Sequence, residues 1–415
     1  MTKLAAILLP AFLSFCSHCF GGTIIRSTTI PNVPFNLDET IGFRLFVLNG
    51  NNFLMTASSF DTGSSFLYTN GSWTSLRQYG GLMNPYVKDE NLFLPFMEYP
   101  AGKITIQKFQ KNNKLVKMLD IEGDLIKDSV PWVGKSLFPV PDQNDSYYLL
   151  AARSVFPTNP GEFIFDFASG GHGIYYVKPI LAEVRDGKVG KPQKLKYGGK
   201  RDETFYIKEV VQSKDLVHFL GLRQQEKRAW GPREINFTPV ILHHASYNLK
   251  KKKVTQTNPI YTDTPRSDKD THTEYAYMDI SMDALDDNVF VAFSWVKRNY
   301  QTIPPYGVKY AESNIFYWDC VQDKVTKAEK IADGFNPVVR ADSLGNVHLL
   351  YVNSKANLMH KVKRKGAWQQ ANVLVNRVDT KPYTDSIAAG FDKNNNLHVV
   401  YPSGDNLIHA VLKVN

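Results

Sequence analysis

The C-terminal part of the chain contains a repeat whose second copy ends one strand early. The segment 342–351 (DSLGNVHLLY) aligns with 392–401 (DKNNNLHVVY), and 358–360 (LMH) then aligns with 407–409 (LIH). Both copies alternate apolar and polar residues around turns rich in Asp, Gly and Asn, which is typical of strands. Only the first copy continues to a fourth strand, around Trp368. Self-similarity in β-rich units of about 50 residues predicts a β-propeller with one blade per repeat.

A strand from the other end of the chain can complete the last blade. Residues 23–30 (TIIRSTTI) form a β-branched run, and pairing it with the last strand would remove two open sheet edges. We therefore expect an all-β chain, a single seven-bladed β-propeller of four-stranded blades, closed by the N-terminal strand. The inner strands are expected to begin near Gly42, Asn84, Lys135, Ile207, Ala276, Asn336 and Ser386.

The first residues have the layout of a secretory leader. Lys3 precedes an apolar stretch at 4–15, and the small residues Gly21 and Gly22 follow it. We predict a signal peptide over 1–21, the propeller over 22–415, and a secreted or periplasmic monomer after cleavage. No later apolar run approaches the roughly 20 residues of a membrane-spanning helix. Of three cysteines only Cys320 lies beyond the leader, so we expect no internal disulfide.

The charge of the chain bears on its partners. Lys and Arg number 49 against 40 Asp and Glu, a formal net charge of +9. An exported basic protein suits an acidic polysaccharide or another envelope glycan, and we expect no nucleic acid as a partner. The basic run at 250–253 lies between two strand-like segments and is interpreted as an exposed hairpin turn.

Long connections mark one face of the predicted disc. The links from second to third strand are short in most units but are expected to span 154–171, 224–236 and 297–313 in three consecutive units. A further long link, 262–275, emerges on the same face. Function is commonly carried by loops on a rigid scaffold, so these loops form the candidate site. The alternative is that they are insertions that the fold merely tolerates.

Histidine and tyrosine in these segments are candidates for proton transfer. His172 follows two glycines and precedes Tyr175, and glycine lets a ligand approach the backbone closely. His243 and Tyr247 share one face of a predicted strand, because side chains alternate with period two. The alternatives are a glycine-rich turn with an exposed histidine, and a packed or solvated pair formed with His244.

Other residues of the same segments suit substrate binding. Arg228 and Arg233 could hold a carboxylate or sulfate through paired hydrogen bonds, and Trp230 offers a face for a sugar ring. His272 lies in the acidic link 263–274, whose oxygen ligands would suit calcium. That link lacks the glycine of calcium-binding loops, so we expect no metal and no cofactor.

Histidine also recurs at equivalent positions of predicted second strands. These residues are His218, His348 and His398. Recurrence from blade to blade is typical of a structural role, so we do not assign them to the site.

The repeated units 342–351 and 392–401, together with 205–208 preceding 215–219, make the chain resemble the BNR-repeat, sialidase-like propeller group. The segment 59–66 (SFDTGSSF) is similar to an Asp-box with Phe in place of Trp. The Arg-Ile-Pro motif and the arginine triad of sialidases have no assignable counterpart. Within the group, the resemblance extends to seven-bladed lyases of uronate-containing polysaccharides, such as ulvan lyases.

This resemblance implies an exported carbohydrate-interacting protein. As a polysaccharide lyase it would cleave a uronate glycan by β-elimination. His172 or His243 would be the base, Tyr247 or Tyr175 would protonate the leaving oxygen, and Arg228 or Arg233 would stabilise the enolate-like charge.

Two alternatives stay open, so the chain need not be an enzyme. One is a non-catalytic envelope propeller that binds or scaffolds. The other is a glycoside hydrolase, for which Glu162, Asp166 and Glu274 are the candidate acids, although nothing pairs them at the separation that hydrolysis requires.

Overall fold

The computed structural model is all-β, with no helix among the residues that it describes. Consequently no helix long and apolar enough to cross a membrane is found in that part of the chain. The described residues are 23–30, 40–47, 53–59, 63–69, 72–76, 85–88, 91–98, 103–109, 115–123, 136–140, 143, 145–155, 176–195, 203–225, 240–263, 272–301, 307–380 and 386–414.

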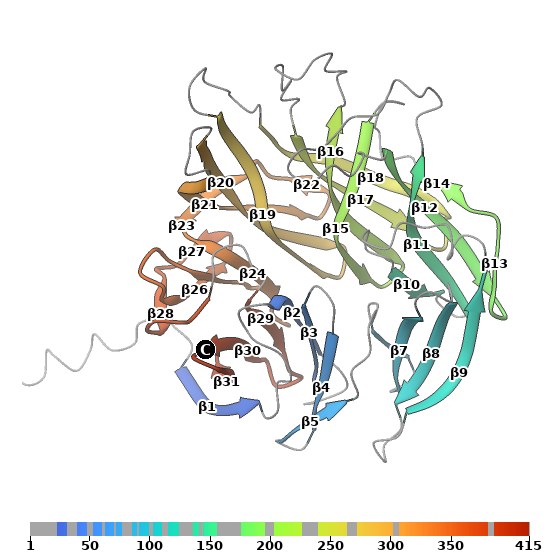
Figure 1. Ribbon diagram of the computed structural model, residues 1–415, viewed down its shortest axis with the longest axis horizontal. Coiled ribbons are helices and arrows are strands. Elements are labelled where there is room, and N and C mark those ends of the chain that lie inside the picture. Colours follow the sequence, from blue (N-terminus) through green and yellow to red (C-terminus); the bar gives the residue numbers. More distant parts are fainter. Residues whose placement is uncertain are drawn as a thin grey trace, which may run out of the picture.

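Antiparallel meanders of consecutive strands build the first half of the fold (Figure 1). The first meander is β2 (Thr40–Val47), β3 (Phe53–Ser59), β4 (Gly63–Thr69) and β5 (Ser72–Leu76). The second is β6 (Tyr86–Lys88), β7 (Asn91–Glu98), β8 (Lys103–Phe109) and β9 (Leu115–Glu122). The third is β10 (Ser136–Pro139), β11 (Ser146–Val155), β12 (Tyr176–Arg185) and β13 (Lys188–Val189), with β14 (Gln193–Lys194) also on β12. A parallel bridge between β13 and β9 joins the last two into one nine-stranded sheet.

The second half repeats the pattern with longer strands. Its first meander is β15 (Glu203–Ser213), β16 (Leu216–Gln225), β17 (Val240–Asn248) and β18 (Lys253–Asp263). Next come β19 (His272–Leu285), β20 (Asn288–Gln301), β21 (Gly307–Val321) and β22 (Lys324–Val325), with β23 (Glu329–Asp333) beside β21. Then follow β24 (Phe335–Ala341), β25 (Val347–Val352), β26 (Leu358–Arg364) and β27 (Ala367–Trp368), with β28 (Asn372–Val375) beside β26.

The last sheet combines both ends of the chain. It contains β29 (Ala388–Phe391), β30 (Asn396–Ser403), β31 (Asn406–Lys413) and, at its edge, β1 (Thr23–Ile30). β1 runs antiparallel to β31 from the pair Thr23–Lys413 to the pair Ile30–Leu407, with one bulge after Ile24. The predicted pairing of the N-terminal strand with the last strand is therefore present. Ile30 is buried at the end of this ladder.

The meanders follow one another around a common centre, and the first meander lies beside the last sheet (Figure 1). From the second meander to the last sheet, hydrophobic clusters fill the spaces between successive meanders. One cluster joins the two ends of the series, packing Phe53, Met55 and Phe66 of the first meander against Val400 and Leu407 of the last sheet. Burying each such side chain stabilises the fold by roughly 1.5–3 kcal/mol. We call this contact between β2–β5 and the last sheet the seam.

The two aligned repeats have the same turn geometry. Asp342 Oδ1 accepts hydrogen bonds from the amides of Leu344 (2.9 Å) and Asn346 (2.8 Å). Asp392 Oδ1 does the same for the amides of Asn394 (2.9 Å) and Asn396 (2.8 Å). An aspartate that bonds its own backbone in this way stabilises a tight turn, which explains why the chain reverses at both positions.

The recurring histidines lie in buried pairs between neighbouring strands. His348 and His360 bring Nδ1 and Nε2 to 2.9 Å, and His398 and His409 do so at 2.8 Å. A third pair, formed by His218 with His244, has the same two atoms at 3.2 Å. The rings of each pair are stacked. Their burial agrees with the structural role predicted from recurrence.

At the seam, one histidine pair belongs to a chain of hydrogen bonds. Asp392 Oδ2 lies 3.3 Å from His398 Nε2, which must donate to a carboxylate. For neutral rings, His398 Nδ1 then accepts from His409 Nε2, and His409 Nδ1 accepts from Trp73 Nε1 at 3.3 Å. The ring of Phe53 stacks on His398 with centroids 3.9 Å apart. This chain ties β5 of the first meander to the last sheet.

Cys320 is buried and carries a free thiol. Burial, together with the nearby Asp323 and Asp319, raises the pKa of this thiol. It is therefore shielded and poorly nucleophilic.

Deleting residues 1–30 should destabilise the protein more than deleting residues 1–22. The longer deletion removes β1, which leaves β31 with an open edge and uncovers the apolar cluster around Leu407 in which Ile30 is packed. We expect its melting temperature to fall by at least about 5 °C, or the protein to aggregate. Equal melting curves for the two truncations, measured by circular dichroism, would contradict a stabilising role for β1.

Acid should destabilise the fold through the buried histidines. Burial lowers the pKa of His360 and of His409 to about 3 and that of His218 to about 4. Unfolded imidazole titrates near 6.5, so between that pH and about 4 the unfolded state binds more protons than the folded one. The free energy of unfolding should therefore decrease as the pH is lowered. At pH 5 it should be roughly 2 kcal/mol per histidine below its value at neutral pH.

Urea denaturation at pH 7.5 and pH 5 measures this effect. His360→Gln should reduce the pH dependence, because it removes one of the buried imidazoles whose pKa is lowered. A free energy of unfolding that stays constant over this range would show that the imidazoles are not buried as neutral rings.

Candidate functional site

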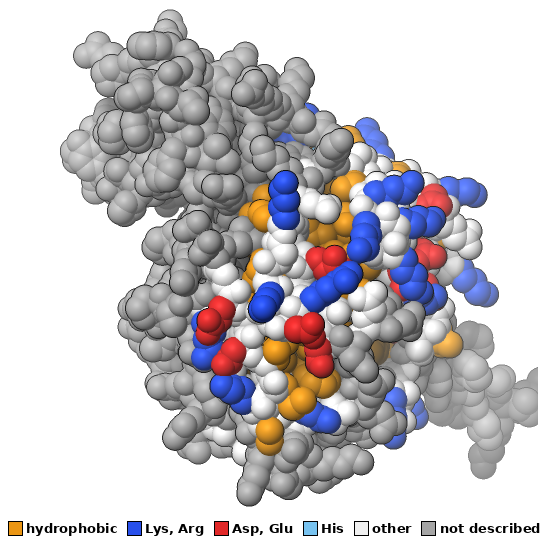
Figure 2. All heavy atoms as spheres, turned by 90° about the vertical axis from the view of Figure 1, so that its right-hand side faces the viewer, with side chains coloured by type: hydrophobic (Ala, Val, Ile, Leu, Met, Phe, Trp, Pro, Cys, Tyr) orange, Lys and Arg blue, Asp and Glu red, His pale blue; other side chains and the backbone are white. Residues whose placement is uncertain are grey.

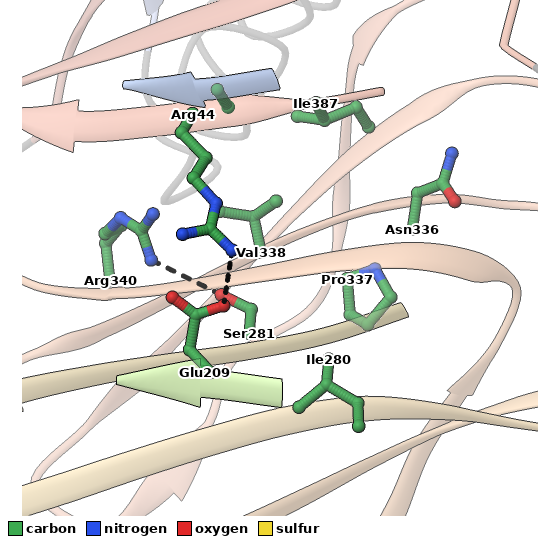
Figure 3. A pocket seen from close by; sticks show the side chains of 10 residues that line it. Arg44, Glu209, Ile280, Ser281, Asn336, Pro337, Val338, Arg340 and Ile387 are labelled. Atoms are coloured by element: carbon green, nitrogen blue, oxygen red, sulfur yellow. Dashed lines mark hydrogen bonds and ion pairs between the residues drawn. The ribbon is translucent and has the colours of Figure 1, made fainter. Parts of the chain in front are cut away.

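The first strands of several meanders, which lie toward the common centre in Figure 1, line a small pocket (Figure 3). Its volume is about 50 Å³, which gives room for ordered waters or one small anionic group. The lining residues are Arg44 of β2, Glu209 of β15, Ile280 and Ser281 of β19, Asn336, Pro337, Val338 and Arg340 of β24, Ala388 of β29 and the preceding Ile387. We call this site the axial pocket.

Arg44 and Glu209 face each other in the axial pocket, although they come from different meanders. The closest nitrogen and oxygen are 4.0 Å apart, and the side chains are 58% and 23% exposed. Such an exposed, long ion pair contributes only about 0–1 kcal/mol. An anion from solution can therefore compete with Glu209 for the Arg44 guanidinium.

Arg340 presents a second guanidinium, held in place by its neighbours. Its Nη1 donates to Ser281 Oγ (3.3 Å) and to the carbonyl of Val339 (2.6 Å), and its Nε donates to the carbonyl of Ala389 (2.7 Å). These partners belong to β19, β24 and β29, so three sheets set its orientation. Figure 3 shows both arginine side chains directed toward Glu209 and Ser281.

Two further carboxylates lie near this centre. Burial raises the pKa of Asp283, while Arg340 and the amides of Ala341 and Ala284 act in the opposite direction. Asp279 accepts hydrogen bonds from Ser294 Oγ (3.2 Å) and from the amide of Asn336 (3.1 Å). Asp283 lies close enough to share the charge of Arg340, which leaves Arg44 as the more exposed cation of the axial pocket.

Asn336 fixes the start of β24 beside the pocket. Its φ of 51° lies in the left-handed region, which Asn adopts more readily than most residues. Its Nδ2 donates to Ser386 Oγ at 2.7 Å. This bond connects β24 with the segment that leads into β29 and so holds two walls of the axial pocket together.

Two of the predicted catalytic residues are buried within the meander β15–β18. His243 is 2% and Tyr247 5% exposed, both on β17. The Tyr247 ring packs against Tyr148 with centroids 6.0 Å apart, and burial raises its pKa. In this structure a polymer reaches neither side chain. His244, on the opposite face of β17 as expected from strand geometry, pairs with His218.

The other predicted site residues are not brought together by the described part of the structure. His272 is the first residue of β19 and lies opposite Tyr300 in the ladder, but its side chain is outside the described residues. The remaining ones, His172, Tyr175, Arg228, Trp230 and Arg233, also lie outside them. Their predicted roles stay predictions.

The strands that flank the predicted long connections extend further than the sequence indicated. The link expected at 297–313 contains the end of β20 and the start of β21, paired from Val289–Cys320 to Gln301–Gly307. Likewise β16 continues to Gln225 and β19 begins at His272. The prediction missed these extensions because polar residues such as Lys297 and Asn299 interrupt the apolar alternation, while the hairpin ladder continues through them.

The axial pocket was not anticipated from the sequence. Its signal is a single arginine inside an otherwise apolar inner strand, as in TIGFRLFV around Arg44 and FNPVVRA around Arg340. A charged side chain in such a strand must face water or a partner. When inner strands converge on one axis, these exceptions meet.

The described region contains no cluster of side chains arranged to bind a metal ion. No group of three or more His, Cys, Asp or Glu side chains there could hold a metal ion. Most of the acidic link 263–274 lies outside that region.

Comparison with known proteins identifies the kind of fold. No protein-family model matches the sequence, and no curated protein matches it. The structure is similar to the BP39L lectin from Burkholderia pseudomallei, with a TM-score of 0.53, 11% identity and coverage of 91% of this chain and 96% of that chain. It is also similar to the polysaccharide lyase Uly1, with a TM-score of 0.50, 9% identity and coverage of 90% of each chain. Similarity at this level concerns the fold alone, which is β-propeller-like.

Proposed function

We propose that the chain is an exported carbohydrate-interacting β-propeller that binds an acidic glycan through its axial pocket. In this proposal the meanders are seven four-stranded blades, closed by β1 after removal of a signal peptide over 1–21. The succession of meanders around one centre and the β1–β31 ladder support the architecture. The BNR-repeat resemblance and the net charge of +9 support the ligand class and the proposed secreted or periplasmic location.

The observation that carries the proposal is the convergence of Arg44 and Arg340 on a solvent-accessible pocket. Guanidinium groups bind planar carboxylates and sulfates through paired, charge-assisted hydrogen bonds. A uronate carboxylate or a sulfate ester is the anionic group that such a glycan would present.

Binding would exchange one weak contact for stronger ones. The ligand anion displaces Glu209 from the Arg44 guanidinium and approaches Arg340, whose orientation is already set by Ser281 and Ala389. A preorganised guanidinium loses little freedom on binding. Each hydrogen bond to a charged group contributes about 1.5–3 kcal/mol, which would give the site preference for acidic over neutral sugars.

The axial pocket supports binding better than catalysis. Its described lining contains no His or Tyr, the residue types that would transfer protons in β-elimination. Glu209 is the lining carboxylate, without the second one that glycoside hydrolysis uses. A non-catalytic glycan-binding propeller is therefore the function that the described geometry supports best.

A polysaccharide lyase is the second candidate. Its support is the fold shared with a polysaccharide lyase, together with the sequence resemblance. His172 and Tyr175 would then be the base and acid, because His243 and Tyr247 are buried. Arg228, Arg233, Trp230 and His272 would hold the chain of sugars.

Paired substitutions in the axial pocket test the binding proposal. Arg44→Gln should weaken the binding of galacturonate oligosaccharides at least about tenfold, because it removes the exposed guanidinium. Glu209→Gln should strengthen binding, since it removes the competing carboxylate. Isothermal titration calorimetry at low salt measures both. Lys355→Gln, at an exposed position away from the pocket, should have no effect on binding. An affinity that is unchanged in both pocket variants would refute the axial site.

A spectroscopic assay tests the lyase candidate. β-Elimination at a uronate creates a conjugated double bond, so a lyase would raise the ultraviolet absorbance of a uronate polysaccharide. His172→Ala should then reduce the rate about a hundredfold or more, as expected for lost proton transfer. If the absorbance does not rise while calorimetry detects binding, the lyase candidate is excluded and the chain is a glycan-binding protein.

A further inference from the structure

A second cationic surface lies on the outer rim, on the side of the molecule that Figure 2 shows. It covers the ends of β8, β9, β12 and β13 and the hairpin between β17 and β18. We call it the rim strip. Its cations are Lys103, Lys117, Arg185, Lys188, Lys191, Lys250, Lys251, Lys252 and Lys253, and the carboxylates beside them are Asp120, Glu122, Asp145, Glu183, Asp186 and Asp215.

Carboxylates at the core of the strip are each shared by two cations. Asp120 lies 2.8 Å from Lys117 and 3.3 Å from Lys103. Glu183 lies 2.8 Å from Arg185 and, across to the next meander, 3.4 Å from Lys252. Hydrogen bonds from these cations lower the pKa of both carboxyl groups. Each cluster therefore keeps a net positive charge even when every ion pair is formed.

The hairpin at Gly187 makes the strip continuous. The amide of Glu122 donates to the carbonyl of Gly187 at 3.2 Å. The backbones of Lys188 and Glu122 are partners in the parallel bridge between β13 and β9. Gly187 has φ of 75°, and a Cβ there would come within 2.4 Å of the Asp120 carbonyl oxygen. Only glycine allows this approach, which places the Asp120 and Glu183 clusters side by side.

Several cations of the strip point to solvent. Lys188, Lys191, Lys251 and Lys253 are exposed and form no ion pair with any carboxylate among the described residues. The strip ends where acidic turns begin. Beyond the Lys250–Asp215 pair (2.9 Å), Lys214 meets Asp286 at 2.7 Å, and Asp287 and Asp323 follow in the neighbouring turns.

We propose that the rim strip binds an extended anionic polysaccharide at a surface separate from the axial pocket. The identity of the ligand class rests on the proposed function, but the residues are different. A row of lysines on strands and hairpins can contact several charged sugar units of one polymer and release their counterions. The axial pocket, in contrast, has room for a single carboxylate or sulfate. Tethering at the rim would raise the local concentration of glycan available to the axial pocket.

The strip fits a polymer better than a lipid surface. Its exposed large apolar side chains are Val116 and Met118, both at one end on β9. A membrane-binding face would spread apolar side chains among its cations. An anionic membrane is accordingly the competing outcome of the test.

The test uses the full-length mature protein and a triple variant, Lys188→Gln/Lys251→Gln/Lys253→Gln. Its matched control is Lys324→Gln/Lys355→Gln/Lys393→Gln, which removes the same charge from exposed lysines elsewhere. Binding to immobilised polygalacturonate is measured over a series of salt concentrations. We expect the rim variant to lose at least about tenfold in affinity, and the slope of log affinity against log salt to become shallower by two to three, roughly one per lysine removed. The control variant should behave as the unmodified protein.

Further arms separate this proposal from the axial site. Monomeric galacturonate should bind the rim variant normally and should lose affinity in Arg44→Gln. Polymer binding that falls equally in the rim and control variants would overturn the proposal, because net charge alone would then explain it. Absence of polymer binding by the unmodified protein would also overturn it, as would rim-dependent binding to phosphatidylglycerol vesicles without polymer binding.

Discussion

The fold depends on how the two ends of the chain meet. β1 pairs with β31 along its length, and the core of the seam packs Phe53 and Phe66 of the first meander against Val400 and Leu407. An open series of sheets would expose an edge and an apolar face at each end. Among the described residues the only cysteine is the free Cys320, so no disulfide there links the two ends. The non-covalent contact at the seam therefore holds the ends of the chain together.

The polar groups at the seam form a series of hydrogen bonds with a fixed order of donors and acceptors. From Trp73 through His409 and His398 to Asp392, every hydrogen bond runs the same way. The neutral rings have one donor and one acceptor nitrogen each, so every position in this chain is matched. The pair His218 and His244 has no such continuation, because His218 Nε2 and His244 Nδ1 have no hydrogen-bond partner in the described part of the chain. In the two C-terminal repeats, Asp342 and Asp392 each accept a hydrogen bond from a histidine. His360 Nδ1 has no partner among the described residues, so the series is complete only in the last repeat, where Trp73 supplies the final donor. The axial pocket also depends on the last sheet, because Arg340 donates a hydrogen bond to the carbonyl of Ala389 in β29.

Much of the fold was predictable because the repeat combines local and long-range signals. The turns at Asp342 and Asp392 use backbone bonds that depend only on nearby residues, and the β-branched run in β1 indicated a strand in need of a partner. The axial pocket was not predictable, since Arg44 and Glu209 are far apart in sequence and meet only after the sheets are arranged. The burial of His243 and Tyr247 was missed for a related reason: alternation shows which residues share a face, but not whether another sheet covers it.

Hydrogen exchange of the native protein, followed by mass spectrometry, tests the central claim that β1 is an integral strand of the last sheet. If β1 completes that sheet, the amides of β1 and of β29–β31 should exchange together, with one opening free energy close to that of global unfolding. Raising the urea concentration should then lower the protection of both segments in parallel. Exchange of β1 amides within seconds, while β30 and β31 stay protected, would contradict the account and would show that the sheet is stable without its N-terminal strand.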